Sequence, residues 1–361
     1  MQSNNLELYL TLILSELSLG KQKLMKEYFD MDNLRIVEGY TGDIVKILTG
    51  QEFQAVKQTI LSGAVNKHLE ELSKLGMGII TIDSEEYPEI LKNIHEPPLV
   101  LYYRGDITLL KTDCIAIVGT RFCTRYGTTQ AERFAKDLCN AGFTIVSGLA
   151  EGIDTYAHKG ALSVKGKTIA VMAGGLKTIY PAINANLARE ISEQGLLISE
   201  NVPKFLPKKY AFAKRNRIIS GISQGVFVPE MGIKSGAMIT LNYANEENRN
   251  IFVLPGNVTS SSSAGTNNII RNLQGACVLE PNDIIKNYNE HSLINDKKTI
   301  KNHIQLDIYE KMIYDLLQVE ELHFDELLQK TQLEPKKLTS MLTTMEIRGL
   351  IKKLAGNFFT V

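Results

Sequence analysis

The chain has 361 residues, which is enough for two or three domains. Hydrophobic residues make up 44% and charged residues 22%, values typical of globular proteins, so a mostly disordered or fibrous chain is excluded. Forty basic residues balance 40 acidic ones, and the formal net charge is zero. Any affinity for nucleic acid must therefore come from a local patch, because the chain as a whole provides no positive field.

Compartment and metal content follow from the cysteines, histidines and apolar runs. The four cysteines form no C-x-x-C pair, and a chain of this length needs no disulfide framework, so we expect free thiols. Histidines and cysteines show no zinc spacing, and we predict no metal site and no cofactor. The apolar run Leu8–Leu14 is too short for a membrane span and lacks the basic flank of a signal peptide. We therefore predict a cytoplasmic protein with no membrane association.

The N-terminal residues 1–72 predict a small helical domain of the SAM or helix-hairpin kind. Apolar residues recur at helical spacing over 6–17, and Gly20 ends this first helix. Further helices are predicted over 21–29 and 41–58.

A change of pattern follows at residue 73. Residues 73–105 hold two apolar strand-like runs and the pair Pro97-Pro98, and they predict an extended segment that leads into the next domain. Over 106–288, nearly continuously apolar runs alternate with amphipathic helical stretches, which indicates a parallel sheet covered on both faces. The runs lie at 114–118, 143–147, 168–172, 195–199, 225–228 and 251–254. We predict an α/β fold with a Rossmann-like, doubly wound parallel sheet.

The C-terminal part has a different organisation. Residues 289–302 are polar and predict a linker. Three helical stretches and two short runs around Gly356 predict a winged-helix-like domain over 303–361. From Asp307 onward, nine acidic residues exceed seven basic ones, so the sequence leaves open whether this domain contacts DNA or protein.

Glycines recur where the predicted strands end, at the edge where open α/β sheets bind ligands. Gly119, Thr120 and Arg121 follow the first strand. Ser147 ends the second strand and opens a loop with Gly148 and Gly152, and Gly174 follows the third strand. Free amides where a helix begins form an anion site, and the arginine adds a charge suited to phosphate. The loops predict a phosphate-containing ligand; the alternative is that the glycines only allow tight strand–helix turns.

Missing motifs narrow the choice of ligand. The dinucleotide fingerprint G-x-G-x-x-G and the P-loop are both absent, so we do not expect NAD, FAD or a P-loop nucleotide. No base accompanies Ser147, and Asp154 with His158 offers too few metal ligands. We interpret Asp154 as a helix N-cap and His158 as a packed residue, and we predict no catalytic residue.

The strongest local charge lies between Glu200 and Glu230, where no acidic residue occurs. Basic side chains follow a phosphate backbone and aromatic rings stack on unpaired bases, which is typical of single-strand binding. The alternative is a solvated loop whose aromatic residues pack inward. The residues concerned are Lys204, Lys208, Lys209, Lys214, Arg215 and Arg217, interleaved with Phe205, Tyr210 and Phe212.

Over residues 114–280 these motifs together resemble the DNA-processing protein A family (DprA, also called Smf). Each motif is weak alone, but the ordered set is specific. Two departures are Phe212-Ala213, where the family usually has Phe-Pro, and Pro229-Glu230-Met231, where a strand usually ends Val-Glu-Ala. The main matching stretches are IVGTR at 117–121 with Tyr126-Gly127, VSGLAEGIDTYAHKGAL at 146–162, RNRIISG at 215–221 and SGAMIT at 235–240.

The resemblance implies a non-catalytic, homodimeric protein that binds single-stranded DNA. It further implies that the protein protects incoming DNA and loads RecA recombinase onto it during natural transformation or recombination. By the same resemblance Arg121 contacts phosphate, Arg215 and Arg217 match an Arg-Asn-Arg element, and Phe212 meets a base. The candidate nucleic-acid-binding residues are Gly119, Thr120, Arg121, Tyr126, Gly127, Ser147, Gly148, Gly152, Gly174, Phe212, Lys214, Arg215, Asn216 and Arg217.

Two other classes stay open from the sequence. A nucleotide-processing enzyme of the lysine-decarboxylase-like, phosphoribohydrolase type has a similar sheet and similar glycine loops. That family's Pro-Gly-Gly-x-Gly-Thr loop is missing here, and Pro255-Gly256-Asn257 is the nearest approach to it. Release of free base from a nucleoside monophosphate would favour the enzyme. The third class is an interaction scaffold in which the outer helical domains matter most.

Overall fold

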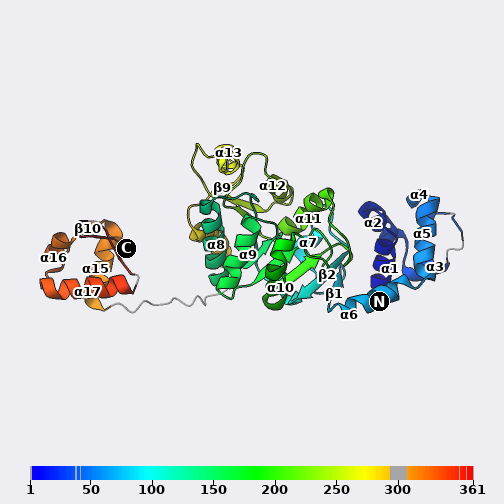
Figure 1. The fold of residues 1–361 in the computed structure, drawn as a ribbon, viewed down its shortest axis with the longest axis horizontal. Helices are drawn as coiled ribbons and strands as arrows, with labels where there is room; N and C mark the ends of the chain where they lie inside the picture. The colour runs from blue at the N-terminus through cyan, green and yellow to red at the C-terminus, as the bar shows by residue number, and fades with distance from the viewer. Residues whose placement is uncertain are drawn as a thin grey trace. The chain divides into compact units, whose positions relative to one another are not determined.

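The computed structural model divides into two compact units, residues 1–294 and 295–361 (Figure 1). The first unit contains a group of helices and a large sheet, and the second contains a small winged helix. None of the described helices is both long and apolar enough to cross a membrane. The described residues are 2–36, 39–40, 42–292, 307–348, 350–354 and 356–360.

Six short helices open the first unit. The helix predicted over 41–58 is divided in two, because Thr49 forms a capping box with Glu52 and so starts a new helix. Thr41 lies outside the described residues. The helices are α1 (Gln2–Leu14), α2 (Leu19–Tyr28), α3 (Met31–Ile36), α4 (Ile44–Ile47), α5 (Gly50–Leu61) and α6 (Ala64–Lys74).

Nine strands form one sheet in the order β1-β2-β6-β5-β4-β3-β7-β8-β9. Each predicted strand is present, within one residue at either end. Neighbouring strands in the part β6-β5-β4-β3-β7-β8-β9 are all parallel. At the other edge, β1 pairs with β2 and β2 pairs with β6 in antiparallel orientation. The strands are β1 (Gly78–Thr81), β2 (Val100–Gly105), β3 (Cys114–Ile117), β4 (Thr144–Ser147), β5 (Thr168–Val171), β6 (Leu196–Ser199), β7 (Gly225–Val228), β8 (Asn250–Val253) and β9 (Ala276–Cys277).

Residues 73–105 extend the sheet as well as leading into it. They contain β1, helix α7 (Glu89–Lys92) and β2, and β2 pairs with β6 in a register that sets Tyr102 opposite Ser199. The two strand-like runs were predicted, but their antiparallel place in the sheet was not, because the partner strand lies far later in the chain.

Helices cover both faces of the sheet, and alternate side chains of β3 show how. Ala116 belongs to a buried cluster with Ile218 and Leu241, on helices α11 and α12. Ile115 faces the other way and clusters with Phe134 of helix α8. The remaining elements of this unit are α8 (Arg125–Asn140), α9 (Ile153–Ser163), α10 (Ala185–Gln194), α11 (Lys209–Gly221), α12 (Ala237–Glu246), α13 (Ala264–Arg271), α14 (Pro281–Ser292) and the short 3-10 helices η1 (Ile107–Lys111) and η2 (Ala182–Asn184).

The N-terminal helices share a hydrophobic core with the sheet. Leu10 and Phe53 of the helices lie in the same buried cluster as Tyr102 of β2 and Leu197 of β6. Because burial of apolar surface is the main stabilising term in folding, this shared core holds the helices against the β1–β2 edge.

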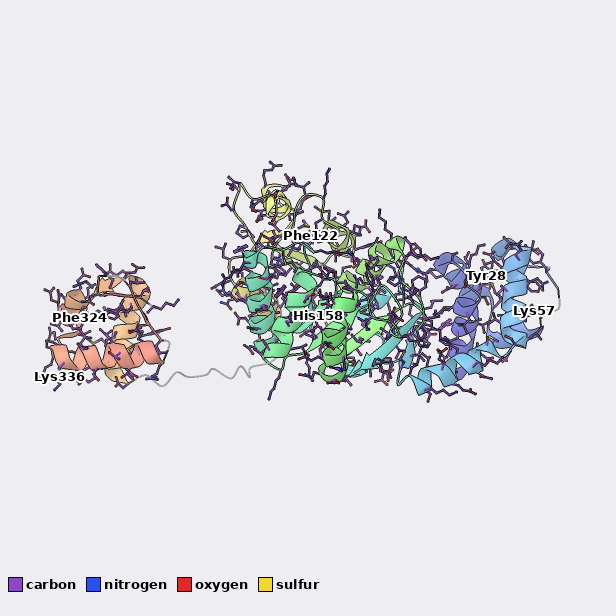
Figure 2. The ribbon with its side chains drawn as sticks, in the orientation of Figure 1. Tyr28, Lys57, Phe122, His158, Phe324 and Lys336 are labelled. Carbon is purple, nitrogen blue, oxygen red and sulfur yellow. The ribbon has the colours of Figure 1, made fainter. Side chains whose placement is uncertain are left out.

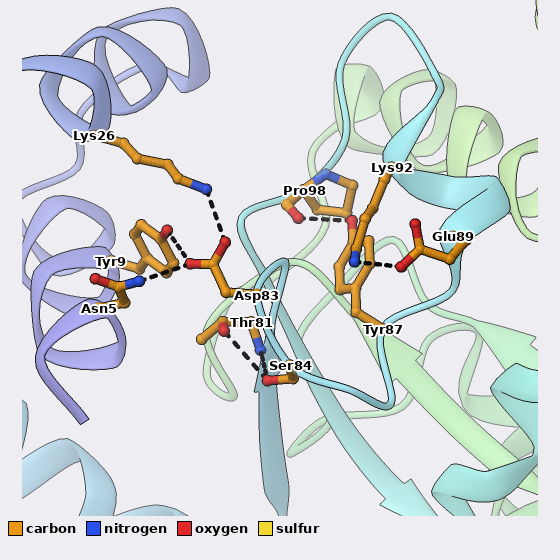
Figure 3. Close-up of polar contacts among 10 residues, drawn as sticks. All are labelled: Asn5, Tyr9, Lys26, Thr81, Asp83, Ser84, Tyr87, Glu89, Lys92 and Pro98. Atoms are coloured by element: carbon orange, nitrogen blue, oxygen red, sulfur yellow. Dashed lines mark hydrogen bonds and ion pairs between the residues drawn. The ribbon is translucent and has the colours of Figure 1, made fainter. Parts of the chain in front are cut away.

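A polar contact adds to that packing (Figure 3). Asn5 Nδ2 and Lys26 Nζ each lie 3.1 Å from a carboxylate oxygen of Asp83, and the Tyr9 hydroxyl donates to the same carboxylate. Burial raises the pKa of Asp83, but the bonds from Tyr9 and Lys26 outweigh it and leave that pKa below its usual value. Three donors from α1 and α2 thus converge on one carboxylate next to β1.

The second unit is a winged helix built around its own core, which includes Ile313, Leu327, Leu338 and Phe359. Strand β12 lies between β10 and β11 in an antiparallel sheet, so the predicted wing is present with one further strand. Most of the predicted linker lies outside the described residues, and its first part belongs to α14. The elements are α15 (Ile308–Val319), β10 (Leu322–His323), α16 (Phe324–Thr331), α17 (Pro335–Ile347), β11 (Lys352–Lys353) and β12 (Phe358–Thr360).

Candidate nucleic-acid interface

A groove of about 1350 Å³ opens at the switch point of the sheet, between β3 and β7, where the order in which strands are added reverses. Strand β3 lies between β4 and β7, so the loops that leave β3 and β7 diverge and leave a crevice at the carboxyl edge. Three segments line this crevice: 118–122 after β3, 208–219 at the start of α11, and 232–240 between β7 and α12.

Four exposed basic residues line the groove: Arg121, Lys208, Lys209 and Lys234. None of the four forms an ion pair with any residue that the structure describes. Their charges are therefore available to an anionic ligand, and they give the groove a positive character that the neutral chain as a whole lacks.

Aromatic side chains lie among these cations. The Arg121 guanidinium carbon lies 5.4 Å from the centre of the Phe212 ring. The Tyr180 ring also contacts Phe212, with the two ring centroids 5.6 Å apart at an interplanar angle of 61°. Tyr210 and Phe122 line the same groove and are 58% and 89% exposed. Figure 2 labels Phe122. Exposed rings beside unpaired cations are the combination that binds unpaired bases and their phosphates.

Arg215, one of the candidate nucleic-acid-binding residues, is buried. It is 5% exposed, and its Nη1 donates to the carbonyl oxygens of Gly148, at 2.6 Å, and Val171. Burial lowers the pKa of Arg215 to about 10, with Asp154 opposing the shift, so the side chain stays charged at neutral pH. Because its donors bind the ends of β4 and β5, Arg215 is a structural part of the groove floor.

Arg217 and Lys214 also have partners within the chain. Arg217 is 3% exposed and forms an ion pair with Glu200, which follows β6. Lys214 Nζ lies 3.4 Å from the same carboxylate and does not line the groove. The candidate Arg217 is thus buried and paired with Glu200, and it does not line the groove.

The predicted anion sites at the strand–helix loops are occupied by carboxylates of the chain itself. Asp154 accepts from the amides of Gly148 and Ala150, at 3.1 and 3.4 Å. Glu230 accepts from the amide and the hydroxyl of Thr124, both at 2.7 Å. Asp154 is therefore not an N-cap, since Gly152 holds that position. The amides of Gly148, Ala150 and Thr124 are therefore already bonded to carboxylates of the chain.

The loop glycines serve close packing, which was the alternative interpretation. A Cβ at Gly148 would lie 2.5 Å from the Arg215 guanidinium. Gly152 has φ +79°, and a Cβ there would collide with the carbonyl oxygens of Thr120 and Arg121. An added Cβ at Gly119, Gly127 or Gly174 would also lie less than 3.0 Å from atoms of neighbouring residues. Glycine is therefore required at these positions by the packing of the chain itself.

Several other predicted site residues also lie outside the groove. Ser147 is buried and donates to Ile117 O at 2.7 Å, and Tyr126 donates to Pro255 O at 2.8 Å. His158 is packed as interpreted: its Nδ1 lies 2.7 Å from Thr168 Oγ1, and burial lowers its pKa to about 3. The candidates that line the groove are Gly119, Thr120, Arg121, Phe212, Arg215 and Asn216.

Sequence reasoning missed part of the groove. Lys208, Lys209 and Tyr210 belong to the basic run but were not chosen, although the absence of acidic neighbours marked them equally. Lys234 was not among the predicted site residues either. Its place just after β7, at the strand end beside the switch point, was the signal that would have found it.

Comparisons with known proteins agree with this architecture. A family model described as DNA recombination-mediator protein A matches residues 78–289, and one described as DprA winged helix domain matches residues 303–357. The DNA processing protein DprA of Bacillus subtilis is 44% identical over 202 residues, which are 56% of this chain and 67% of that protein. Across the first curated relatives the match covers 52–67% of their length.

Two solved structures are similar as well. DNA processing protein A from Streptococcus pneumoniae superposes with a TM-score of 0.69 at 34% identity, covering 79% of this chain and 98% of that one. DNA processing protein A from Helicobacter pylori, described for its unique single-stranded DNA binding mode, gives 0.54 at 32% identity, covering 59% and 96%.

The fold is thus that of a Rossmann-like domain followed by a winged helix, with a basic and aromatic groove at its switch point. The chain belongs to the DprA/Smf family of DNA recombination-mediator proteins.

Proposed function

We propose that the chain binds single-stranded DNA in the groove at the switch point, as a binding protein and not as an enzyme. The observation that carries this proposal is a groove lined by Phe212 and by four exposed cations that have no ion-pair partner among the described residues, with Arg121 over the Phe212 ring. Arg121 and the lysines follow the phosphates, while Phe212 and Tyr210 offer faces on which bases stack. The description of the H. pylori relative supports the same ligand.

Single-strand binding is tested by the salt dependence of affinity. We expect labelled oligo(dT) to bind more tightly than a duplex of equal length, because stacking requires unpaired bases. If all four cations contact phosphate, log affinity should fall against log salt with a slope of about −2.8, from about −0.7 per contact. Fluorescence anisotropy between low and moderate salt measures this slope. An affinity that does not change with salt would contradict the proposal.

A separate activity assay distinguishes the proposal from the enzyme alternative. Asp154 and Glu230, the carboxylates beside the loops, are bonded to backbone amides. Free base released from a nucleoside monophosphate, seen by chromatography, would favour a phosphoribohydrolase over a binding protein.

We further propose that the protein acts as a homodimer, protects incoming strands, and loads RecA recombinase onto them during natural transformation or recombination. Family membership supports this role. On DNA coated with a single-strand-binding protein, adding the chain is expected to shorten the lag before RecA hydrolyses ATP. A lag of unchanged length, with DNA binding intact, would contradict RecA loading and leave the DNA-binding proposal standing.

A further inference from the structure

Glu71 of α6 lies between two lysines of the sheet domain. Its carboxylate is 2.8 Å from Lys204 Nζ and 3.8 Å from Lys177 Nζ. The hydrogen bond from Lys204 is the main reason why the pKa of Glu71 lies below its usual value. One acidic side chain of the N-terminal helices therefore neutralises part of the basic run that the sequence singles out.

The position of Glu71 is determined by packing, unlike that of most surface ion-pair partners. Val65 and Leu72 on the same helix are buried, and His68 Nε2 lies 3.1 Å from the hydroxyl of Tyr102 on β2. The Asp83 contact holds the neighbouring helices α1 and α2 to the same edge of the sheet (Figure 3). The carboxylate is thus presented to the two lysines by a docked helix.

The two lysines lie on loops at the same edge of the sheet as the groove. Their loops follow β5 and β6 and are joined by backbone hydrogen bonds, from Gly175 N to Phe205 O at 2.8 Å and from Lys177 N to Pro203 O at 3.0 Å. Tyr180 belongs to the first of these loops, and its ring contacts Phe212 at the groove. Tyr180 is the third residue after Lys177, so their Cα atoms lie at most about 11 Å apart.

The intervening surface suits unpaired bases. Tyr180 is 53% exposed, and Ile183 and Leu206 are 77% and 64% exposed on the loops after β5 and β6. Exposed apolar and aromatic side chains beside lysines repeat the chemistry of the groove itself.

We infer that Lys177 and Lys204 form a second segment of the single-strand track, and that Glu71 of the N-terminal helices masks this segment until a strand long enough to reach it displaces the carboxylate. The inference rests on the proposed function and adds a regulatory role for the helices. Phosphates compete with Glu71 for the same ammonium groups. Glu71 therefore does not change the affinity of short strands that occupy only the groove. Longer strands must displace Glu71 from the two lysines, so they bind less tightly than they would if Glu71 were absent.

The test compares E71Q with E70Q in the full-length chain. Glu70 is the adjacent residue on α6, is exposed, and forms no ion pair with any residue that the structure describes. Both variants lose one negative charge, but only E71Q frees the lysines. Affinities are measured by anisotropy with oligo(dT) from about 4 to about 20 nucleotides, a range that brackets known single-strand site sizes.

For the longest oligonucleotide, E71Q is expected to bind about two- to fivefold more tightly than wild type, the range set by exposed ion pairs. The shortest should bind equally well to all three proteins. E70Q should match wild type at every length. K204A should weaken only the long oligonucleotides, lower their salt slope by about 0.7, and cancel the gain of E71Q in the double variant.

The results distinguish failure of the masked segment from failure of single-strand binding itself. Equal affinities of E71Q and E70Q at all lengths, or a K204A variant that binds long strands normally, overturn the masked segment while binding in the groove stands. A wild-type chain that binds no single-stranded DNA overturns both proposals. Urea unfolding of E71Q beside E70Q shows whether the helices stay docked. If E71Q unfolds earlier and still gains no affinity for long strands, the masking role is overturned.

Discussion

Replacing Arg121, Lys208 and Lys209 together by alanine is expected to reduce affinity for single-stranded DNA about fiftyfold at 0.15 M salt. Each lost phosphate contact removes about 0.7 from the slope of log affinity against log salt, so the slope should become shallower by about 2. The three side chains are exposed and have no ion-pair partner among the described residues, so their removal should leave the stability of the fold unchanged.

The control removes the same charge elsewhere. Arg133, Lys159 and Lys167 are exposed and do not line the groove, so their triple alanine variant should keep nearly the whole affinity and slope. The loss in the groove variant should also be similar for all base sequences, because phosphate contacts carry no sequence information. A loss of equal size in both variants would mean that net charge, and not the groove, governs binding.

The substitution Arg217→Met is expected to lower the free energy of unfolding by about 3–5 kcal/mol. Removing one partner of a buried ion pair leaves the other charge poorly compensated in a medium of low polarity. Arg217 and Glu200 are both nearly inaccessible to solvent, and Lys214 provides the carboxylate with only a longer contact of 3.4 Å. Urea unfolding followed by circular dichroism measures the change.

A second substitution tests whether the loss comes from the unpaired charge. Adding Glu200→Gln to Arg217→Met should recover part of the lost stability, because neither charge is then left without its partner. The folded Arg217→Met protein should retain the wild-type salt slope for DNA. A stable variant with a shallower slope would show instead that Arg217 contacts phosphate directly, as the resemblance alone implies.

The parallel core of the sheet was predictable because its signal is local. Each of the strands β3 to β8 is a short apolar run, and helical patterns occupy most of the gaps between them. The edge was not predictable in the same way. The runs in 73–105 are equally apolar, but their antiparallel place depends on β6, and nothing within the segment specifies that partner.

The site shows the same division. Arg121 could be chosen because it directly follows a strand, where the geometry of parallel sheets places ligands. Arg215 and Arg217 could not be separated from Lys208 and Lys209 by residue type. Their roles differ because they lie on the buried side of α11, where Arg215 donates to the carbonyls of Gly148 and Val171 and Arg217 pairs with Glu200. These contacts exist only once the strands β4, β5 and β6 have been brought together beside α11, so residue type alone does not reveal them.

The antiparallel pairing of β2 with β6 has a consequence for any shortened form of the protein. A fragment that begins at residue 106 lacks β2, so the backbone groups that Tyr102 and Tyr103 pair on β6 would lose their partners. Open strand edges of this kind are templates for intermolecular β-pairing and aggregation. The segment that contains β1 and β2 therefore protects the edge of β6 from pairing with another molecule.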